Sequence, residues 1–445
     1  MNDSFDPRCY GAVADGHSKD TAAVQAAIDA AAAQGGTVRL AGGIFVCGTL
    51  YLKSNVALEI TNSATLLASP NIADYGTDTH HNRYRNEPEL DRCFLFAQDA
   101  ENVTICGSGV IDGNAAAFPN AGSIYRPMLL RVLRCRNVRV TGLRLLNAAA
   151  WTTAFLDSDF LWATDLHIEN HRNYNGDGLD FDGCRHVWVR GCYIDGTDDN
   201  LCLQSSGLPV QDVHISDCAF TSVCAGIRIG LKSIGEISGV VISNCTMRNV
   251  WREGIKLECT EGGSITDILV ENVTMHNVRR PIFAILNNRY RPDDLGSSVE
   301  LDHIPPIGTM ARLRFVGITA VDDEEMAHAQ RRFDNDIMGE PKFGGCRFDA
   351  NAAHPMEDVT IRDFRYTAIG GVRLSDLPAA PYPEVPDRLQ APTAPGSENY
   401  YPDWSRTTHL DARNVRGLTL ENLHFNTLYP DERPKMLTEG PTVML

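Results

Sequence analysis

Hydrophobic and polar positions alternate in a short phrase that recurs along most of the chain. The phrase reads apolar-x-apolar-polar-small/polar-apolar-x-apolar, and the steps between its instances are 35, 23, 26, 26, 27, 28, 45, 46 and 59 residues. Its instances begin at Val103, Val138, Leu161, Val187, Val213, Val240, Ile268, Leu313, Val359 and Leu418. Such alternation is typical of a β-strand with one buried face. A period in the twenties is typical of a solenoid of stacked coils.

The period and the short strands favour a right-handed, single-stranded parallel β-helix, an all-β fold. Leucine-rich repeats share this period, but their Leu-Asn signature is absent. The long steps near the C-terminus indicate inserted loops, and we predict one domain over residues 1–445. Residues 374–403 are Pro-rich and cannot form a central strand. They predict an inserted loop that is either ordered against the body or a mobile flap.

Residues 1–60 differ from the repeats and predict an N-terminal cap with the first strands. An Ala-rich stretch from Asp20 to Ala33 predicts a helix with Asp20 as its N-cap. Gly35 and Gly36 are expected to end it. One helix ahead of many strands indicates a cap over the end of the solenoid.

A second phrase, small-apolar-x-apolar, places polar residues in rows. It occurs at Gly178, Asn200, Gly226 and Gly254, at steps of 22, 26 and 28 residues. Equivalent strands on successive coils would stack their side chains about 4.8 Å apart. The rows are Asp177, Asp199, Ala225 and Glu253, then Asp180, Cys202, Arg228 and Lys256, then Asp182, Gln204, Gly230 and Glu258.

Three carboxylates near these rows are the candidate catalytic residues. Asp177 lies in Asn-Gly-Asp-Gly, and Asp198 and Asp199 lie in Gly-Thr-Asp-Asp. Clustered carboxylates raise one another's pKa, which provides the proton donor and ionised base that acid–base catalysis needs. The alternative is that aspartates in Gly-rich turns merely accept from backbone amides. The joint presence of Arg228 and Lys256 favours a catalytic role.

Composition excludes some partners. The formal net charge of -17 does not suit nucleic acid or an anionic membrane, and no apolar run approaches the ~18 residues of a membrane span. The N-terminus shows no apolar leader, and the 13 cysteines form no disulfide or zinc pattern. These features predict a cytoplasmic protein; its oligomeric state is not predicted.

The candidate site resembles the polygalacturonase family, family 28 of the glycoside hydrolases. The family's Asn-Thr-Asp-Gly motif is matched by Asn175–Gly178, and its Gly-Asp-Asp-Cys motif by Thr197–Asn200. The opening Tyr10-Gly-Ala-Val-Ala-Asp-Gly and the phrase Gly109-Val-Ile-Asp-Gly are also similar. The resemblance implies a parallel β-helix and hydrolysis with inversion, without metal or cofactor. It implies that Asp198 is the general acid and that Asp177 and Asp199 hold and deprotonate the attacking water.

Two further motifs of the family are altered here. Gly-His-Gly appears as Cys224-Ala225-Gly226, and Arg-Ile-Lys falls on Lys256-Leu257-Glu258. The resemblance implies that the missing cations hold a galacturonate carboxylate, while Arg228 adds a cation one coil earlier. We therefore predict a pectin-derived or related oligosaccharide, and not plain polygalacturonate, as the substrate.

Ten residues are candidates for substrate binding, and long loops after Ile285 and Leu374 favour exo action. The candidates are Asn175, Asp180, Gln204, Arg228, Lys256, Glu258, Trp151, His171, Arg289 and Tyr290. Packing is the alternative for Trp151, and a plain surface role is the alternative for His171. Rival functions are another carbohydrate chemistry on this fold (a lyase, a glycosyl-transferring or an isomerising enzyme) and a non-catalytic β-helix that binds glycans.

Overall fold

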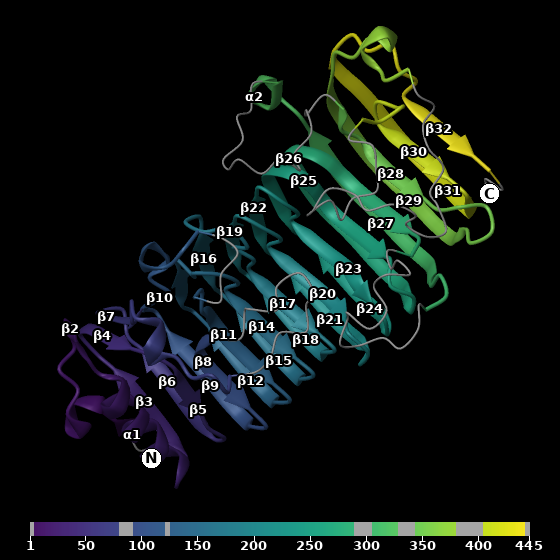
Figure 1. Cartoon of the computed structure of the whole chain (residues 1–445). Helices are drawn as coiled ribbons and strands as arrows, with labels where there is room; N and C mark the ends of the chain where they lie inside the picture. The colour runs from purple at the N-terminus through teal and green to yellow at the C-terminus, as the bar shows by residue number, and fades with distance from the viewer. Residues whose placement is uncertain are drawn as a thin grey trace. The chain divides into compact units, whose positions relative to one another are not determined.

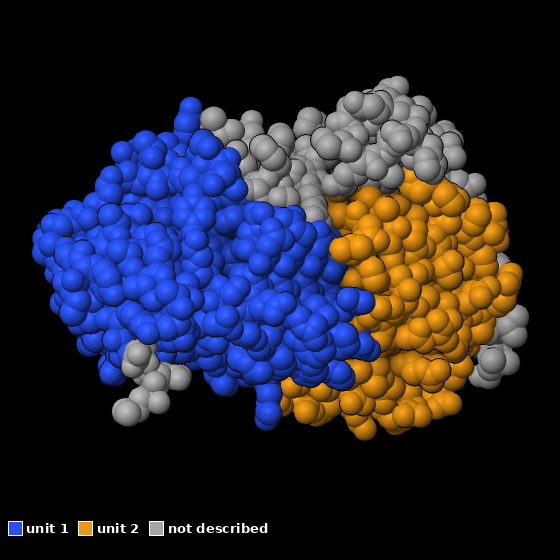
Figure 2. Space-filling view, turned by 90° about the horizontal axis from the view of Figure 1, so that it is seen from below, with its two compact units in different colours: residues 1–198, 212–214 blue, residues 199–211, 215–445 orange. Residues whose placement is uncertain are grey.

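The computed structural model describes residues 4–79, 92–120, 125–288, 305–327, 343–379 and 404–440. The chain divides into two compact units, which Figure 2 shows in different colours. Unit 1 comprises residues 1–198 and 212–214, and unit 2 comprises residues 199–211 and 215–445. The single domain over residues 1–445 stays a prediction.

Unit 1 is built almost entirely of short strands (Figure 1). They are β1 (Ser4–Phe5), β2 (Asp15–Lys19), β3 (Gly36–Leu40), β4 (Gly43–Cys47), β5 (Leu50–Leu52), β6 (Val56–Ile60), β7 (Ala64–Ala68), β8 (Cys93–Gln98), β9 (Glu101–Gly107), β10 (Val110–Asp112), β11 (Met128–Leu133), β12 (Arg136–Thr141), β13 (Arg144–Leu146), β14 (Thr153–Leu156), β15 (Asp159–Thr164), β16 (His167–Asn170), β17 (Leu179–Asp182), β18 (Arg185–Arg190) and β19 (Tyr193–Gly196). Its helices are α1 (Thr21–Ala32) and the 3₁₀ turns Pro7–Tyr10, Ile72–Asp74 and Ala115–Ala117.

Unit 2 continues with longer strands. They are β20 (Leu201–Ser205), β21 (Val210–Ser216, which also contains the residues 212–214 of unit 1), β22 (Ala219–Ser222), β23 (Ile227–Ser233), β24 (Glu236–Ser243), β25 (Thr246–Cys259), β26 (Ser264–Leu286), β27 (Thr309–Val321), β28 (Cys346–Asp349), β29 (Met356–Gly370), β30 (Leu410–Arg413), β31 (Val415–Tyr429) and β32 (Met436–Glu439). The helices are α2 (Glu324–Ala327) and the 3₁₀ turn Leu374–Asp376. Residues 380–403 of the Pro-rich insertion lie outside the described residues.

Through most of unit 1, each strand pairs in parallel with the strand three places along the chain. Thus β11 pairs with β8 and β14, β12 with β9 and β15, and β13 with β10 and β16. Three strands therefore fill one coil, and each coil pairs with the next (Figure 1). This arrangement confirms the predicted parallel β-helix.

The recurring phrase supplies the core of the coils. Val138 pairs with Val103 and Leu161, and Leu161 pairs with Val187, so that equivalent apolar residues stack inward. These side chains are almost completely buried. Alternation places the polar residues between them on the outer face. The predicted register is therefore confirmed by the pairing.

The bend before each repeated strand needs a left-handed residue, and asparagine often fills it. Asn55, Asn102 and Asn137 have φ near +60°, a conformation that asparagine tolerates better than most side chains. Their amides form a ladder, because Asn102 Nδ2 donates to Asn55 Oδ1 (2.8 Å) and Asn137 Nδ2 donates to Asn102 Oδ1 (2.6 Å). The ladder thus links three successive coils at this bend.

The predicted N-terminal helix is confirmed, but its start is built differently from the expectation. Asp20 directly precedes α1 and makes no side-chain cap hydrogen bond. Its carboxylate instead accepts from the backbone N–H groups of Val13 (2.7 Å) and Ala14 (3.0 Å). Asp20 therefore secures the preceding loop, while the apolar face of α1 packs against β1, β3 and β5. None of the described helices is both long and apolar enough to span a bilayer.

One buried carboxyl in unit 2 predicts a pH-dependent stability. Burial raises the pKa of Asp322 to about 7, although its Oδ2 accepts from the Ile369 N–H (3.0 Å). A carboxyl with a raised folded-state pKa stabilises fully below its ordinary value of 3.8, and that stability is lost as pH rises towards 7. The loss is at most about 4 kcal/mol, from 1.36 kcal/mol per pKa unit.

We therefore expect Asp322→Asn to have a higher melting temperature than the wild type at pH 8, by several degrees. The difference should disappear near pH 4, where the wild-type carboxyl is neutral. Thermal unfolding at both pH values measures it, with Asp358→Asn as a control for the chemical change at an exposed site. Equal melting temperatures at pH 8 would contradict the raised pKa.

Candidate active site

In unit 1, Asp177 lies two residues before the start of β17. Its backbone carbonyl accepts from the Thr152 N–H (2.9 Å), and β17 pairs with β14 through Thr153–Leu179 and Ala154–Asp180. Asp177 is buried, with 3% of its surface exposed. The neighbouring coil therefore fixes the backbone that carries this carboxylate.

The glycine of the Asn-Gly-Asp-Gly motif is required by a close approach. A Cβ on Gly176 would lie 2.4 Å from Thr197 Oγ1 and 2.7 Å from the Asn170 carbonyl oxygen. Instead, the Gly176 N–H donates to Thr197 Oγ1 (3.0 Å), and this hydroxyl donates to the Asn173 carbonyl (2.6 Å). Thr197 thus connects the loop before Asp177 with the turn that leads to Asp198.

Arg126 supports the same loop, although no motif in the sequence pointed to it. Its Nη2 donates to Asn175 Oδ1 (2.8 Å), and its Nη1 donates to the Tyr174 carbonyl (2.5 Å). Asn175 adopts φ of 57°, and both side chains are buried. The candidate ligand Asn175 is therefore held by Arg126, which lies 49 residues earlier in the chain.

Three other candidates of unit 1 have distinct surroundings. Asp180 is buried on β17 beside Ala154, which pairs in turn with Arg131. Trp151 is buried in an apolar cluster with Phe96 and Met128, which favours the packing role. His171 is partly exposed, and its Nε2 lies 3.0 Å from Asp195 Oδ2.

In unit 2, strand register confirms the predicted row that contains Cys202, Arg228 and Lys256, whereas the register shifts between Leu203 and Ser205, at Gln204 of the next row. Cys202 of β20 pairs with Arg228 of β23, which pairs with Lys256 of β25. In the next outward row, Gly230 pairs with Glu258. The apolar residues between them, such as Ile227 and Ile255, are buried in the core. The polar side chains of both rows therefore lie on the opposite face of this sheet.

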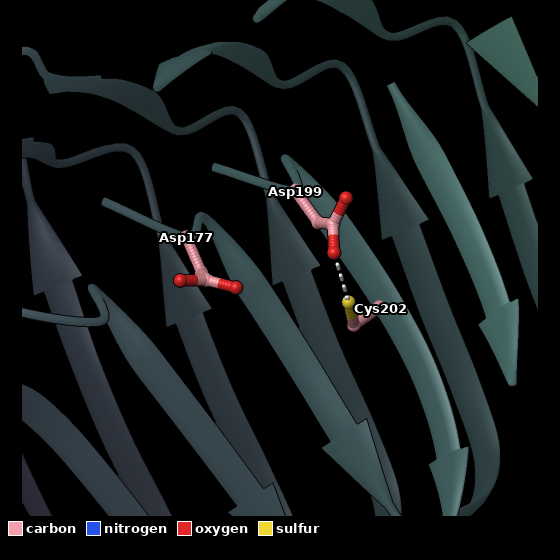
Figure 3. A group of neighbouring side chains, drawn as sticks. All are labelled: Asp177, Asp199 and Cys202. Carbon is pink, nitrogen blue, oxygen red and sulfur yellow. Dashed lines mark hydrogen bonds between the residues drawn. The ribbon is translucent and has the colours of Figure 1, made fainter. Parts of the chain in front are cut away.

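Asp199 is the most enclosed of the candidate carboxylates, with 0% of its surface exposed. Arg228 Nη1 lies 2.7 Å from Asp199 Oδ2, and the Ala225 N–H donates to Oδ1 (3.2 Å). The Cys202 thiol donates to Oδ2 (3.6 Å), as Figure 3 shows in a view that also labels Asp177. Burial opposes ionisation, but the positive charges of Arg228, Lys256 and Arg252 outweigh it and lower the pKa of Asp199.

Asp198 precedes this carboxylate directly and is only half-buried. Two consecutive carboxyl groups therefore have different environments, one enclosed among cations and one partly open to solvent. Environments that differ in this way separate an acid from a base in acid–base catalysis. The pair can thus supply a proton donor and an ionised group.

Lys256 is surrounded by glutamates on its own strand. Its Nζ lies 3.4 Å from Glu258 Oε2 and 3.7 Å from Glu253 Oε2. Burial and the nearby Arg252 would lower the pKa of Lys256, but the two glutamates outweigh them and raise it. Burial would raise the pKa of Glu253, which its cationic neighbours, Lys256 first, lower to about 2. Glu253 and Lys256 are therefore both ionised although they are buried.

Gln204 offers an acceptor that no described residue uses. It lies on β20 with 1% of its surface exposed, and its Oε1 has no hydrogen-bond partner. A buried carbonyl oxygen without a donor is costly. A ligand hydroxyl would satisfy it. The remaining candidates, Arg289 and Tyr290, lie outside the described residues.

Comparison with known proteins identifies the family. The model of glycosyl hydrolases family 28 matches residues 48–300, which is more than half of the chain. The chain belongs to glycosyl hydrolase family 28. An exo-poly-alpha-D-galacturonosidase from Dickeya chrysanthemi is 26% identical over 243 residues, covering 43% of this chain and 40% of that protein. The chain spans about half or less of the length of the first curated relatives it matches.

Solved structures of similar fold include two exopolygalacturonases. A hyperthermoactive exopolygalacturonase from Thermotoga maritima superposes with a TM-score of 0.68 at 20% identity, over 96% of this chain and 92% of that one. The family 28 exopolygalacturonase of Yersinia enterocolitica gives 0.66 at 16% identity, over 100% of this chain and 77% of that one. At these identities the likeness supports the fold alone.

The residues that alter two of the family's motifs contact charged neighbours. Ala225 stands where the family has histidine, and it contributes a backbone N–H to Asp199. Glu258 stands where the family has lysine, and its Oε2 lies 3.4 Å from Lys256 Nζ. Since Arg228 already contacts Asp199, a metal ion at that carboxylate would meet a positive charge.

Proposed function

We propose that the chain is an inverting glycoside hydrolase that acts on a pectin-derived or related oligosaccharide. The observation that carries the proposal is the contrast between consecutive carboxyl groups. Asp199 is fully buried and paired with Arg228, whereas Asp198 is half-buried. The chain can therefore hold an ionised base at Asp199 and a proton donor at Asp198.

The roles follow the family motifs. Asp198 donates a proton to the glycosidic oxygen as the bond to the anomeric carbon breaks. Asp177 and Asp199 hold the water that attacks this carbon and accept its proton, so both protons are accounted for. This division needs the ionised state of Asp199, which its lowered pKa supports.

Inversion gives a direct test of this mechanism. We expect proton NMR of the fresh product to show an anomeric configuration opposite to that of the substrate, before mutarotation equilibrates it. An inverting site places water between carboxyls about 6.5–9.5 Å apart. A product that retains its configuration would instead require a covalent intermediate and a carboxyl pair nearer ~5.5 Å.

The proposed substrate follows from the carboxylates that the cations Lys256 and Arg228 already contact. Lys256 lies between Glu253 and Glu258, and Arg228 contacts Asp199. A neutral sugar whose hydroxyls donate to Glu258 and to the open Oε1 of Gln204 fits these acceptors. Exo action is part of the proposal, supported by the name of the Dickeya relative.

A reducing compartment, the cytoplasm, is proposed as the place of action. All 13 cysteines lie in the described residues as free thiols, which is the usual state in a reducing compartment. The experiment that tests the function is a product assay on a panel of neutral, acidic and mixed oligosaccharides, read by mass spectrometry. Cleavage of any member with gain of one water supports hydrolysis, whereas unsaturated products that absorb in the ultraviolet would show a lyase.

A further inference from the structure

We infer that Arg228 is a positioning residue that acts through Asp199: its guanidinium holds the carboxylate in the orientation in which it accepts a proton from water. This inference rests on the proposed function and deepens it. The sequence alone assigned Arg228 to substrate binding. The contacts of its guanidinium lead to a different role.

The geometry gives Asp199 donors on both of its oxygens. Arg228 Nη1 is 2.7 Å from Oδ2, the Cys202 thiol is 3.6 Å from the same oxygen, and the Ala225 N–H is 3.2 Å from Oδ1. A carboxylate with directional donors on each oxygen has a fixed plane. The fixed plane sets the direction in which the carboxylate can accept a proton.

Strand register explains why Arg228 can make this contact. It pairs directly with Cys202, three residues after Asp199, so its side chain extends from the neighbouring strand over the start of β20. The Arg228 side chain is 11% exposed, and an ion pair at 2.7 Å with so little solvent is only weakly screened. Arg228 is thus a cation in direct contact with this carboxylate.

The other charged groups around Asp199 come from several elements. Lys256, Arg252, Glu253 and Glu258 come from β25, Cys224 precedes β23, and Asp198 precedes Asp199 in the chain. Lys256 is closely balanced by its two glutamates. Removing the charge of Arg228 should therefore change the pKa of Asp199 more than removing any other single cation.

The test compares Arg228→Gln and Arg228→Lys with the wild type in the full chain. Glutamine can still donate a hydrogen bond but carries no charge, so the pKa of Asp199 should rise. We expect the acidic limb of the kcat–pH profile to move to higher pH by roughly one to two pH units. We also expect kcat at the optimum pH to fall about 10²-fold. In Arg228→Lys, the acidic limb should lie close to its wild-type position. KM should change little in both variants.

The matched control is Arg413→Gln. Arg413 also forms a buried ion pair, donating to both oxygens of Asp349 (2.8 and 2.9 Å) on a later coil. Its loss costs stability in the same way without touching Asp199. We expect its pH profile to match the wild type.

Two outcomes would overturn the inference. An unchanged acidic limb with raised KM in Arg228→Gln would make Arg228 a substrate ligand, and an unchanged profile with lowered stability would make it structural. A double-mutant cycle between Arg228→Gln and Asp199→Asn, read by unfolding at pH 7, tests the pair without any activity. If this cycle shows coupling but the protein hydrolyses none of the sugars, the proposed function is refuted while the pairing of Arg228 with Asp199 stands.

Discussion

Asp198→Asn should reduce turnover at least about 10²-fold, because the proposed mechanism then has no proton donor for the leaving oxygen. Asparagine is nearly the same size as aspartate, and Asp198 is only half-buried, so the protein should fold normally. Steady-state kinetics on the best substrate measures the loss, and circular dichroism with thermal unfolding checks the fold. Asp177→Asn and Asp199→Asn should lose activity to a similar degree.

Asp212→Asn is a matched control for this experiment. Asp212 is exposed and adopts φ of 56°, a left-handed conformation that asparagine also tolerates. It should retain wild-type turnover. If Asp198→Asn kept the same activity as this control, Asp198 would not be the general acid.

Plain oligogalacturonides should be poor substrates compared with neutral or rhamnose-containing oligosaccharides at equal concentration. A galacturonate carboxylate held by an arginine gains paired hydrogen bonds that lysine cannot reproduce. Here the ammonium of Lys256 is already shared by Glu253 and Glu258, so a third carboxylate would meet uncompensated negative charge. Initial rates on trigalacturonate and on the mixed panel measure the preference.

A variant that restores the family pattern sharpens this test. Lys256→Arg combined with Glu258→Lys replaces the glutamate with a cation, and we expect it to increase the rate on trigalacturonate and to decrease the rate on neutral sugars. Lys256→Arg alone separates the effect of the guanidinium from that of the lost glutamate. Wild-type turnover of trigalacturonate on the order of 10 per second would contradict the proposed specificity.

The sequence predicted the features of this fold that depend on periodicity. The recurring apolar phrase predicted one strand in each coil between β9 and β31, and the second phrase predicted the register of Cys202, Arg228 and Lys256. Alternation and coil length determine both, and both can be counted along the chain. The candidate rows could therefore be identified before any contact was known.

Contacts made by long side chains could not be predicted in the same way. The pairing of Arg228 with Asp199, and that of Arg126 with Asn175, depends on side-chain conformations at residues 29 and 49 positions apart. Asp20 is a second example. It is a residue typical of a helix cap, but its carboxylate accepts a hydrogen bond from the preceding loop. Periodicity locates a residue on a face, and it does not determine which neighbour that residue contacts.

The length of the coils also affects the order in which the pairing can form. In β14 and β17, paired residues such as Thr153 and Leu179 are 26 positions apart, whereas Ile285 of β26 and Asp349 of β28 are 64 apart. Closing the longer loop costs about 0.8 kcal/mol more in chain entropy, from the logarithmic dependence on loop length. Contacts between β14 and β17 therefore need less loss of chain freedom, and the β26–β28 pairing becomes favourable later in folding. During synthesis this order coincides with the order in which the strands leave the ribosome.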